Sequence, residues 1–221
     1  MYGVSEDAIA VHLYNDSTAT LDVAGGKVRL VQQTRYPWDG AVALTVEPEA
    51  PASFTLHLRI PGWCRKAGLS VNGERLDLAT ITRNGYAAIA RRWTAGDTVR
   101  LDLELAVERI HAHPEIRHDA GRAAIRRGPL VYCLEGVDNG VPLNSLVLPA
   151  DARLTPRDEP GLLGGVVTLE GQARAQPVSD WGDDLYRTTP PAEHPVRIKA
   201  VPYYAWDNRD PGEMLVWVRT A

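Results

Sequence analysis

The sequence is poor in residues that define several classes of small protein. Its 221 residues include one phenylalanine, two methionines and two cysteines. Cys64 and Cys133 are too few for the disulfide framework of a small secreted domain, and they lack CxxC spacing. We expect two buried free thiols, because isolated cysteines behave as small apolar side chains. A disulfide between them and a reactive or metal-bound thiol are the alternatives.

Long apolar runs and an excess of positive charge are also missing. No stretch approaches the roughly 18 apolar residues of a membrane-spanning helix. Lysine and arginine number 24 and aspartate and glutamate 28, so the formal net charge is -4. We therefore expect neither nucleic acid nor membrane as a partner. The first ten residues, MYGVSEDAIA, have no basic start and no apolar segment of a secretory signal, which indicates a cytoplasmic protein.

Alternation of apolar and polar residues is the main positive signal. From Phe54 to Cys64 the sequence reads FTLHLRIPGWC, and every second residue up to Ile60 is apolar. This period of two predicts a strand with one buried face. Pro61 and Gly62 would end the strand, because proline lacks the N–H donor and glycine accepts the bend. Such an apolar face needs a second sheet to cover it.

Short alternating runs recur along the whole chain, and none has a convincing helical period. Asn72-Gly73, between two short apolar runs, predicts a tight hairpin. Tyr86 to Ile89 reads as a short strand, and Val99 to Val107 as a longer one. Residues 173–193, rich in proline, threonine and aspartate, read as a long surface loop.

The fold class follows from these runs. We predict an all-β protein with little or no helix, made of two tandem antiparallel β-sandwich (jelly-roll-like) domains. The polar stretch 111–120, HAHPEIRHDA, is the candidate connection between them. The expected domains are therefore residues 1–118 and 119–221.

A histidine cluster is the first candidate for site chemistry. His111 and His113 would share a face of a strand, with Glu115, His118 and Asp119 close by in sequence. Imidazoles on one face can bind zinc, but a zinc site needs three or four ligands in tetrahedral register. We expect an exposed, hydrogen-bonded connector here and no metal site.

Pairs of carboxylates are the second candidate, because glycoside hydrolysis needs two that face each other across the scissile bond. Glu47 with Glu49, or a pair among Asp180, Asp183 and Asp184, could be suggested. Nothing in their spacing marks a pair. No GxSxG motif is present, and neither cysteine has a histidine near it in sequence. We assign no catalytic residue.

Tryptophans in turn-like segments are the third candidate. Trp38, Trp63 and Trp206 could form a carbohydrate-binding face, because sugars stack their C–H faces on indole rings. Trp181 lies in a similar segment. Packing in the core or between domains is the alternative interpretation of all four.

Several longer stretches together resemble one family. They are VHLYNDS at 11–17, TRYPWDG at 34–40, LRIPGWC at 58–64, VNG at 71–73, GRAAIRRGPLVYCLEGVDN at 121–139 and VPYYAWDNRDPGEMLVW at 201–217. The chain resembles the C-terminal β-sandwich region of glycoside hydrolase family 127, the β-L-arabinofuranosidase family, formerly a domain of unknown function. The resemblance covers essentially the whole chain.

The resemblance implies that a different domain of the parent protein carries catalysis. In that family an N-terminal (α/α)6 barrel carries catalysis, with a cysteine nucleophile in a zinc-bound cluster and a glutamate acid/base. Cys64 and Cys133 match sandwich motifs and not the catalytic ones, so no catalytic residue and no cofactor is carried over to this chain. The implied partner is the N-terminal catalytic barrel. A homodimer and a plant-derived oligosaccharide are further partners that we consider.

The leading hypothesis is therefore the non-catalytic β-sandwich portion of a family 127-like glycoside hydrolase, which supports the catalytic barrel. A carbohydrate-binding module that uses exposed tryptophan and tyrosine is the second, and an independent enzyme with an unrecognised site is the third. The first hypothesis predicts an exposed apolar patch on the first domain, near Met1 to Asp7, where the barrel would adjoin.

Overall fold

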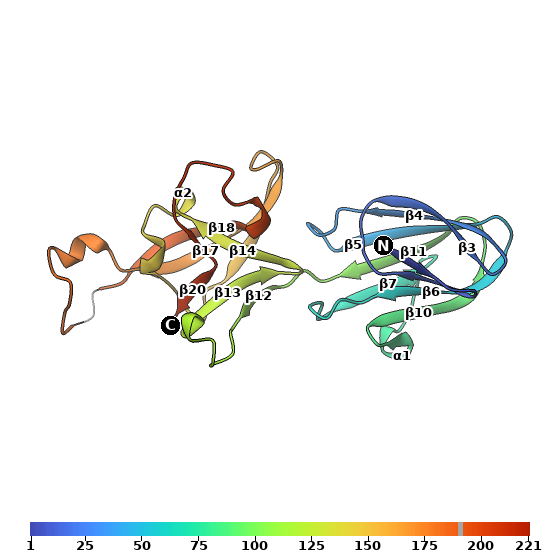
Figure 1. Cartoon of the computed structure of the whole chain (residues 1–221), viewed down its shortest axis with the longest axis horizontal. Coiled ribbons are helices and arrows are strands. Elements are labelled where there is room, and N and C mark those ends of the chain that lie inside the picture. Colours follow the sequence, from blue (N-terminus) through green and yellow to red (C-terminus); the bar gives the residue numbers. More distant parts are fainter. Residues whose placement is uncertain (190–191) are drawn as a thin grey trace. The chain divides into compact units, whose positions relative to one another are not determined.

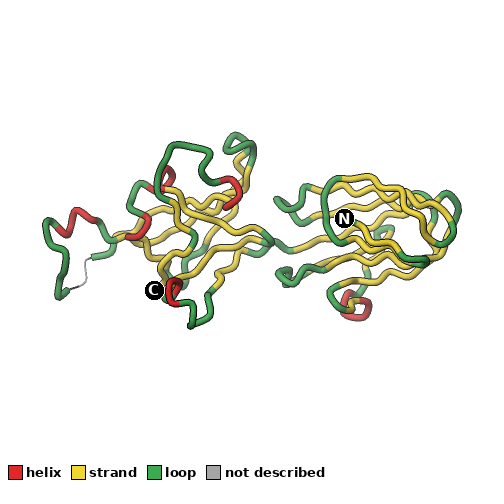
Figure 2. Tube along the Cα trace, in the orientation of Figure 1, coloured by secondary structure: helices red, strands yellow, loops and turns green. Residues whose placement is uncertain are grey.

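A computed structural model describes residues 1–189 and 192–221. The chain divides into two compact units, Met1–Ala106 and Val107–Ala221, and strands dominate both (Figure 1, Figure 2). The prediction of an all-β protein is confirmed. In the described part, the only α-helices are the single turns α1 (Leu78–Ile81) and α2 (Gly136–Asn139). None of the described helices has the length and apolar character needed to span a membrane.

The first unit is a sandwich of two sheets. One sheet has the order β1 (Tyr2–Val4), β2 (Ala8–Val11), β6 (Ala52–Arg59), β10 (Tyr86–Trp93) and β9 (Thr82–Arg83). The other has the order β3 (Ser17–Val23), β4 (Gly26–Thr34), β5 (Ala41–Pro48), β11 (Asp97–Leu103), β7 (Ala67–Val71) and β8 (Glu74–Arg75). Paired strands are antiparallel except β2 and β6, which run parallel.

The strand predicted before Pro61 is β6, and it lies in the middle of the five-stranded sheet. Phe54, Leu56 and Leu58 are buried and Arg59 is exposed, as the alternation predicted. The three apolar side chains belong to one core with buried residues of the six-stranded sheet. That second sheet is the cover that the apolar face requires.

The hairpin predicted at Asn72-Gly73 joins β7 to β8, and both residues have positive φ, 51° and 84°. The Asn72 amide nitrogen donates to Asp97 Oδ1 at 2.7 Å, and its oxygen accepts from the Thr98 N–H at 2.8 Å. The Thr94 N–H donates to Asp97 Oδ2 at 2.9 Å. The hydrogen bonds that Asp97 accepts, first the one from the Thr94 backbone and then the one from Asn72, hold the pKa of its carboxyl below the usual range. The charged carboxylate therefore ties two turns together.

The described strands of the second unit belong to one sheet. Its order is β12 (Val107–Ile110), β13 (Arg122–Arg127), β20 (Trp217–Thr220), β15 (Leu146–Leu148), β17 (Val166–Ala175), β18 (His194–Pro202), β14 (Leu130–Glu135) and β19 (Met214–Leu215), and β16 (Leu154–Glu159) pairs with β17. β13 also pairs with β14, which closes six strands, from β13 through β20, β15, β17 and β18 to β14, into a ring.

This closed ring differs from the two packed sheets that we expected in the second half. Its interior is filled by apolar side chains that alternate inward, among them Ile125, Leu134, Leu169 and Val218. A sandwich and a closed sheet need the same alternation along each strand, so the sequence pattern does not distinguish them. Closure leaves fewer free strand edges than two open sheets would.

The division between the units falls earlier than the expected domain boundary after residue 118. The run from Val99 to Val107 is two strands and not one, because β11 ends at Leu103 and β12 begins at Val107. β11 pairs with β5 and β7 of the first unit, whereas β12 pairs with β13 of the second. The polar stretch 111–120 therefore connects two strands within the second unit. An alternating pattern does not indicate which sheet a strand will join.

Candidate functional site

Two of the three tryptophans considered for carbohydrate contact lie in the first unit. Trp63 is half-buried, packs against the core and stacks on Tyr36, with ring centroids 6.4 Å apart. Trp38, close by in the turn that follows Tyr36, is 37% exposed. Packing therefore explains at least the Trp63 ring. Carbohydrate contact by either tryptophan stays a prediction.

The third tryptophan, Trp206, lies in the second unit, so the three do not share a face of one unit. Trp206 stacks on Tyr203 with ring centroids 6.2 Å apart. Tyr203 and Tyr204 are 44% and 53% exposed. This aromatic loop follows β18. Hydrogen bonds and ion pairs with Glu135 and Asp138 hold it in place.

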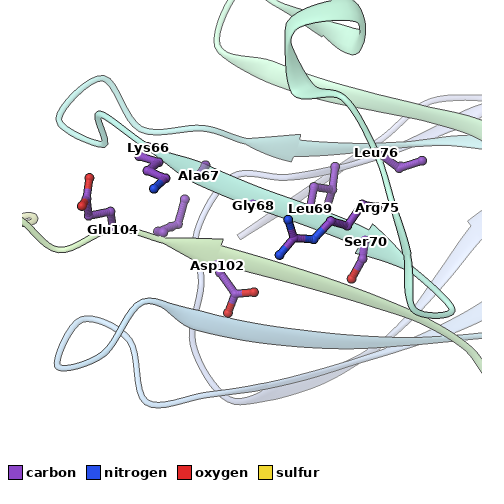
Figure 3. A pocket seen from close by; sticks show the side chains of 10 residues that line it. Lys66, Ala67, Gly68, Leu69, Ser70, Arg75, Leu76, Asp102 and Glu104 are labelled. Atoms are coloured by element: carbon purple, nitrogen blue, oxygen red, sulfur yellow. The ribbon is translucent and has the colours of Figure 1, made fainter.

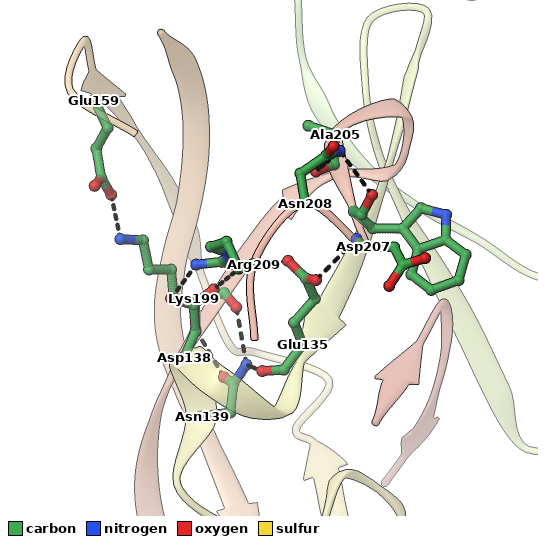
Figure 4. A network of polar contacts seen from close by, with 10 residues as sticks. Glu135, Asp138, Asn139, Glu159, Lys199, Ala205, Asp207, Asn208 and Arg209 are labelled. Carbon is green, nitrogen blue, oxygen red and sulfur yellow. Dashed lines mark hydrogen bonds and ion pairs between the residues drawn. The ribbon is translucent and has the colours of Figure 1, made fainter. Parts of the chain in front are cut away.

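A guanidinium held between two carboxylates anchors this loop (Figure 4). Arg209 donates to Asp138 through both terminal nitrogens, at 2.9 and 2.6 Å, and also pairs with Glu135. The Glu135 and Asp138 side chains are 8% and 11% exposed. The Asp207 N–H donates to Glu135 Oε1 at 3.2 Å. The ion pairs thus fix the loop against the end of β14 and against α2.

The network continues from α2 to β18 and β16 (Figure 4). The Asn139 amide group bonds the backbone of Lys199 in both directions, at 3.0 and 3.1 Å, and donates to the Glu135 carbonyl at 2.7 Å. Lys199 Nζ lies 2.6 Å from Glu159 Oε1. The hydrogen bond from the Lys199 ammonium is the main cause that lowers the pKa of the Glu159 carboxyl.

Sequence reasoning missed this network. Arg209 lies in a turn-rich stretch, where charged residues are ordinarily solvated, and Glu135 and Asp138 follow an apolar strand about 70 residues earlier. The available signal was an acidic pair, one member at the end of the largely apolar strand β14 and the other in the turn that follows it. Carboxylates at such a position need a cation, and the sequence does not say which one.

A hollow of about 510 Å³ adjoins the network on the outer face of β16, β17 and β18. Its lining includes four cationic side chains, two carboxylates and two neutral polar side chains, namely Arg153, Arg157, Arg197, Lys199, Asp138, Glu170, Thr155 and Gln172. We refer to it as the basic hollow.

A second hollow, of about 530 Å³, lies beside β7 and β11 of the first unit (Figure 3). Lys66 and Glu104 lie at one end, and Arg75 and Ser70 at the other (Figure 3). Asp102 is bound by the neighbouring Arg100, at 2.9 Å. The charges of this lining are balanced, so it selects no ligand by charge.

The histidines of the stretch 111–120 are exposed. His113 lies 4.0 Å from Glu115, and both side chains are largely exposed. Within residues 1–189 and 192–221, no group of three or more histidine, cysteine, aspartate or glutamate side chains could hold a metal ion. Cys64 and Cys133 lie in different units, so the described residues do not fit the zinc–thiolate cluster of the resembled family.

Three of the five acidic residues considered for a catalytic pair lie next to basic side chains at the surface. Glu47 pairs with Arg29 across two strands. Asp180 lies 3.6 Å from His194, and Asp184 lies 3.3 Å from Arg187. These pairs are typical of a solvated surface and give no reason to revise the absence of a catalytic assignment.

Both cysteines are free thiols, as expected, with Cys133 buried and Cys64 half-buried. Burial raises the pKa of the Cys133 thiol to about 12, and burial also raises the pKa of Cys64. At pH 8 a disulfide reagent should therefore modify Cys64 slowly and Cys133 only when the second unit opens. In the Cys64→Ser variant, only the modification of Cys133 is measured. A Cys133 rate in the native chain equal to that in guanidinium would contradict this.

Comparison with known families covers nearly the whole chain. The model described as "Beta-L-arabinofuranosidase, GH127 middle domain" matches residues 8–105, and the model described as "Glycoside hydrolase family 127 C-terminal domain" matches residues 107–219. The junction between the two matches coincides with the division between the two compact units.

Individual relatives agree. A non-reducing end β-L-arabinofuranosidase of Bifidobacterium longum subsp. longum is 37% identical over 213 residues, which cover 90% of this chain and 31% of the relative. The crystal structure of a GH127 β-L-arabinofuranosidase from Geobacillus stearothermophilus T6 is 50% identical with a TM-score of 0.96, and the match covers all of this chain and 35% of that one. A solved GH127 β-arabinofuranosidase is 32% identical with a TM-score of 0.89, over 36% of its chain. The chain thus spans about a third of the length of these relatives.

Proposed function

Because this chain belongs to glycoside hydrolase family 127, we propose that it is the non-catalytic β-domain portion of a β-L-arabinofuranosidase-like enzyme. Its role is to support a catalytic domain that the rest of the parent protein supplies. The observation that carries the proposal is the end-to-end match of the family's middle and C-terminal domains to a chain about a third as long as its relatives.

An exposed apolar surface supports this role. Met1, Val4 and Leu13 are 42%, 45% and 56% exposed. They belong to or flank β1 and β2 at the edge of the five-stranded sheet, where the His12 N–H donates to the Met1 carbonyl at 3.0 Å. Exposed large apolar side chains at a sheet edge are typical of surfaces that another domain covers. We assign this edge to contact with the catalytic domain.

The remaining expectations about the parent are part of the same proposal. The resemblance implies a zinc site in the catalytic domain, and we propose the same for the parent protein. A homodimer, a plant-derived oligosaccharide ligand and a cytoplasmic location stay predictions. Carbohydrate contact through Trp38, Trp63 and Trp206 also stays a prediction and is not proposed as the main function.

Activity assays test whether this chain is non-catalytic and supports the catalytic domain. The purified 221-residue chain, with zinc supplied, should release no arabinose from a β-L-arabinofuranoside. In the Geobacillus enzyme, exchanging the matched third for this chain should preserve activity, whereas deleting that third should abolish soluble, active enzyme. Release of arabinose by the isolated chain would refute the proposal.

Paired variants of the exchanged enzyme test the surface. Leu13→Asp should reduce activity and thermal stability, because it places a charge in the contact that we assign to the catalytic domain. Val137→Asp changes a valine that is 48% exposed in the second unit and serves as the control. Equal effects of the two substitutions would contradict the assignment of the β1–β2 edge to contact with the catalytic domain.

A further inference from the structure

The basic hollow stands out because its positive charge is not fully balanced. Lys199 is paired with Glu159 at 2.6 Å, and Asp138 is bound by Arg209. Arg157 and Glu170 are 3.9 Å apart, at the limit of an ion pair. Arg153 and Arg197 are exposed and have no ion pair or hydrogen bond with any described residue. A chain with a net charge of -4 thus presents two unpaired guanidinium groups in one concave site.

The strand register brings these groups to the same side of the sheet. Gln172 of β17 is opposite Arg197 of β18, and one residue beyond the β16–β17 register places Arg153 opposite Gln172 on the other side. Arg153 and Arg197 therefore flank Gln172, with their Cα atoms about 10 Å apart, which is two strand spacings. Their long side chains can reach one ligand between them.

The next row of the register supplies hydroxyl-binding groups. Thr155 is opposite Glu170, and Glu170 is opposite Lys199. A threonine hydroxyl, a carboxylate and the Gln172 amide can together accept from and donate to several hydroxyl groups. The hollow therefore combines cationic forks with neutral and acidic hydrogen-bonding partners, which a site for a simple inorganic anion does not need.

The walls of the hollow are held in place before any ligand arrives. The Asn139 amide bonds the Lys199 backbone in both directions. At Gly171, a Cβ atom would lie 2.6 Å from the Arg153 carbonyl oxygen and 2.7 Å from a Leu154 methyl carbon. The absence of a side chain at Gly171 thus lets β16 approach β17 closely and sets the position of Arg153. Preorganisation of this kind lowers the entropic cost of binding.

We propose that the basic hollow binds an acidic saccharide, a sugar chain that carries a carboxylate such as a uronic acid. Arg153 and Arg197 bind the carboxylate, because the guanidinium fork matches its two oxygens. Thr155, Glu170 and Gln172 bind neighbouring hydroxyl groups. The choice of a saccharide over other organic carboxylates rests on the proposed function of the parent enzyme, whereas the charge selection rests on the hollow alone.

Titration calorimetry on the full 221-residue chain tests the proposal, with trigalacturonic acid as the probe. Binding should be measurable at low ionic strength and should weaken as salt is added. Neutral arabinotriose and inorganic phosphate should bind at least roughly tenfold more weakly. Arabinotriose lacks the carboxylate, and phosphate lacks the sugar hydroxyl groups.

Two double variants separate the site from overall charge. Arg153→Ala with Arg197→Ala should weaken trigalacturonate binding by more than roughly tenfold, because two charge-assisted contacts are lost. Arg35→Ala with Arg117→Ala changes the net charge equally at exposed positions outside the hollow and should leave binding unchanged. Circular dichroism establishes that both variants are folded.

Three results would overturn the proposal: no binding of trigalacturonate, equal binding of arabinotriose or phosphate, or equal loss in the two double variants. None of them bears on the supporting role, which is tested by the activity of the exchanged enzyme. Conversely, arabinose release by the isolated chain would refute the supporting role and leave the charge selectivity of the hollow intact.

Discussion

Replacing Trp93 by alanine should destabilise the first unit by about 3–5 kcal/mol, the usual cost of removing a large aromatic side chain from a core. Trp93 is fully buried, and its ring stacks on Phe54 with centroids 5.7 Å apart. Its indole N–H donates to the Phe54 carbonyl at 3.0 Å. Truncation would leave a cavity between the sheets and a buried carbonyl without this partner, and the two costs add.

Scanning calorimetry, with one transition expected for each unit, measures the effect. The first-unit transition should move to lower temperature and the second-unit transition should not, because the cores of the two units are separate clusters. Trp93→Phe, which keeps most of the buried area, should cost much less. Trp38→Ala, at a side chain that is 37% exposed, is the matched control. A loss from Trp38→Ala as large as that from Trp93→Ala would contradict the packing that we describe.

Replacing Arg209 by methionine should destabilise the second unit by about 3–5 kcal/mol, because removal of one member of a buried ion pair leaves an uncompensated charge. Here two carboxylates, Glu135 and Asp138, would lose the cation that lies between them. Chemical unfolding of the variant and the parent chain at pH 7.5 measures the effect.

Two further variants define what the Arg209 result means. The triple change Arg209→Met, Glu135→Gln and Asp138→Asn should recover much of the lost stability, because it removes the uncompensated charges along with the cation. Arg187→Ala removes an arginine whose pair with the exposed Asp184 spans 3.3 Å at the surface, and it should cost less than about 1 kcal/mol. If the triple variant is no more stable than Arg209→Met, the charge explanation fails and lost packing is the cause.

The β character of the chain could be predicted because alternation is local. Phe54, Leu56 and Leu58 are buried as their spacing indicated, and Asn72-Gly73 turns as its chemistry requires. The extents of strands were harder to predict. β10 continues through Arg91 and Arg92 to Trp93, beyond the end that we expected at Ile89, because pairing with β6 outweighs the polarity of two exposed arginines.

The candidate sites were harder to predict than the strands. Trp63 is explained by packing on Tyr36, which its own neighbourhood in sequence does not reveal. Arg209 meets Glu135 and Asp138, and Arg153 lies across β17 from Arg197, only through pairings between segments that are distant in the chain. A charged residue in a turn gives no indication of its partner.

The sequence alone determined that this protein consists of short strands, where several of its turns fall, and which family its motifs resemble, because each of these depends on residues that are near neighbours along the chain. Only the tertiary structure decided that the second unit closes into a ring, that the units divide at Ala106 and Val107, and that two guanidinium groups without an ion pair among the described residues share one hollow. Those features depend on which strands pair, and strand pairing is selected by the burial of whole faces and not by any one segment.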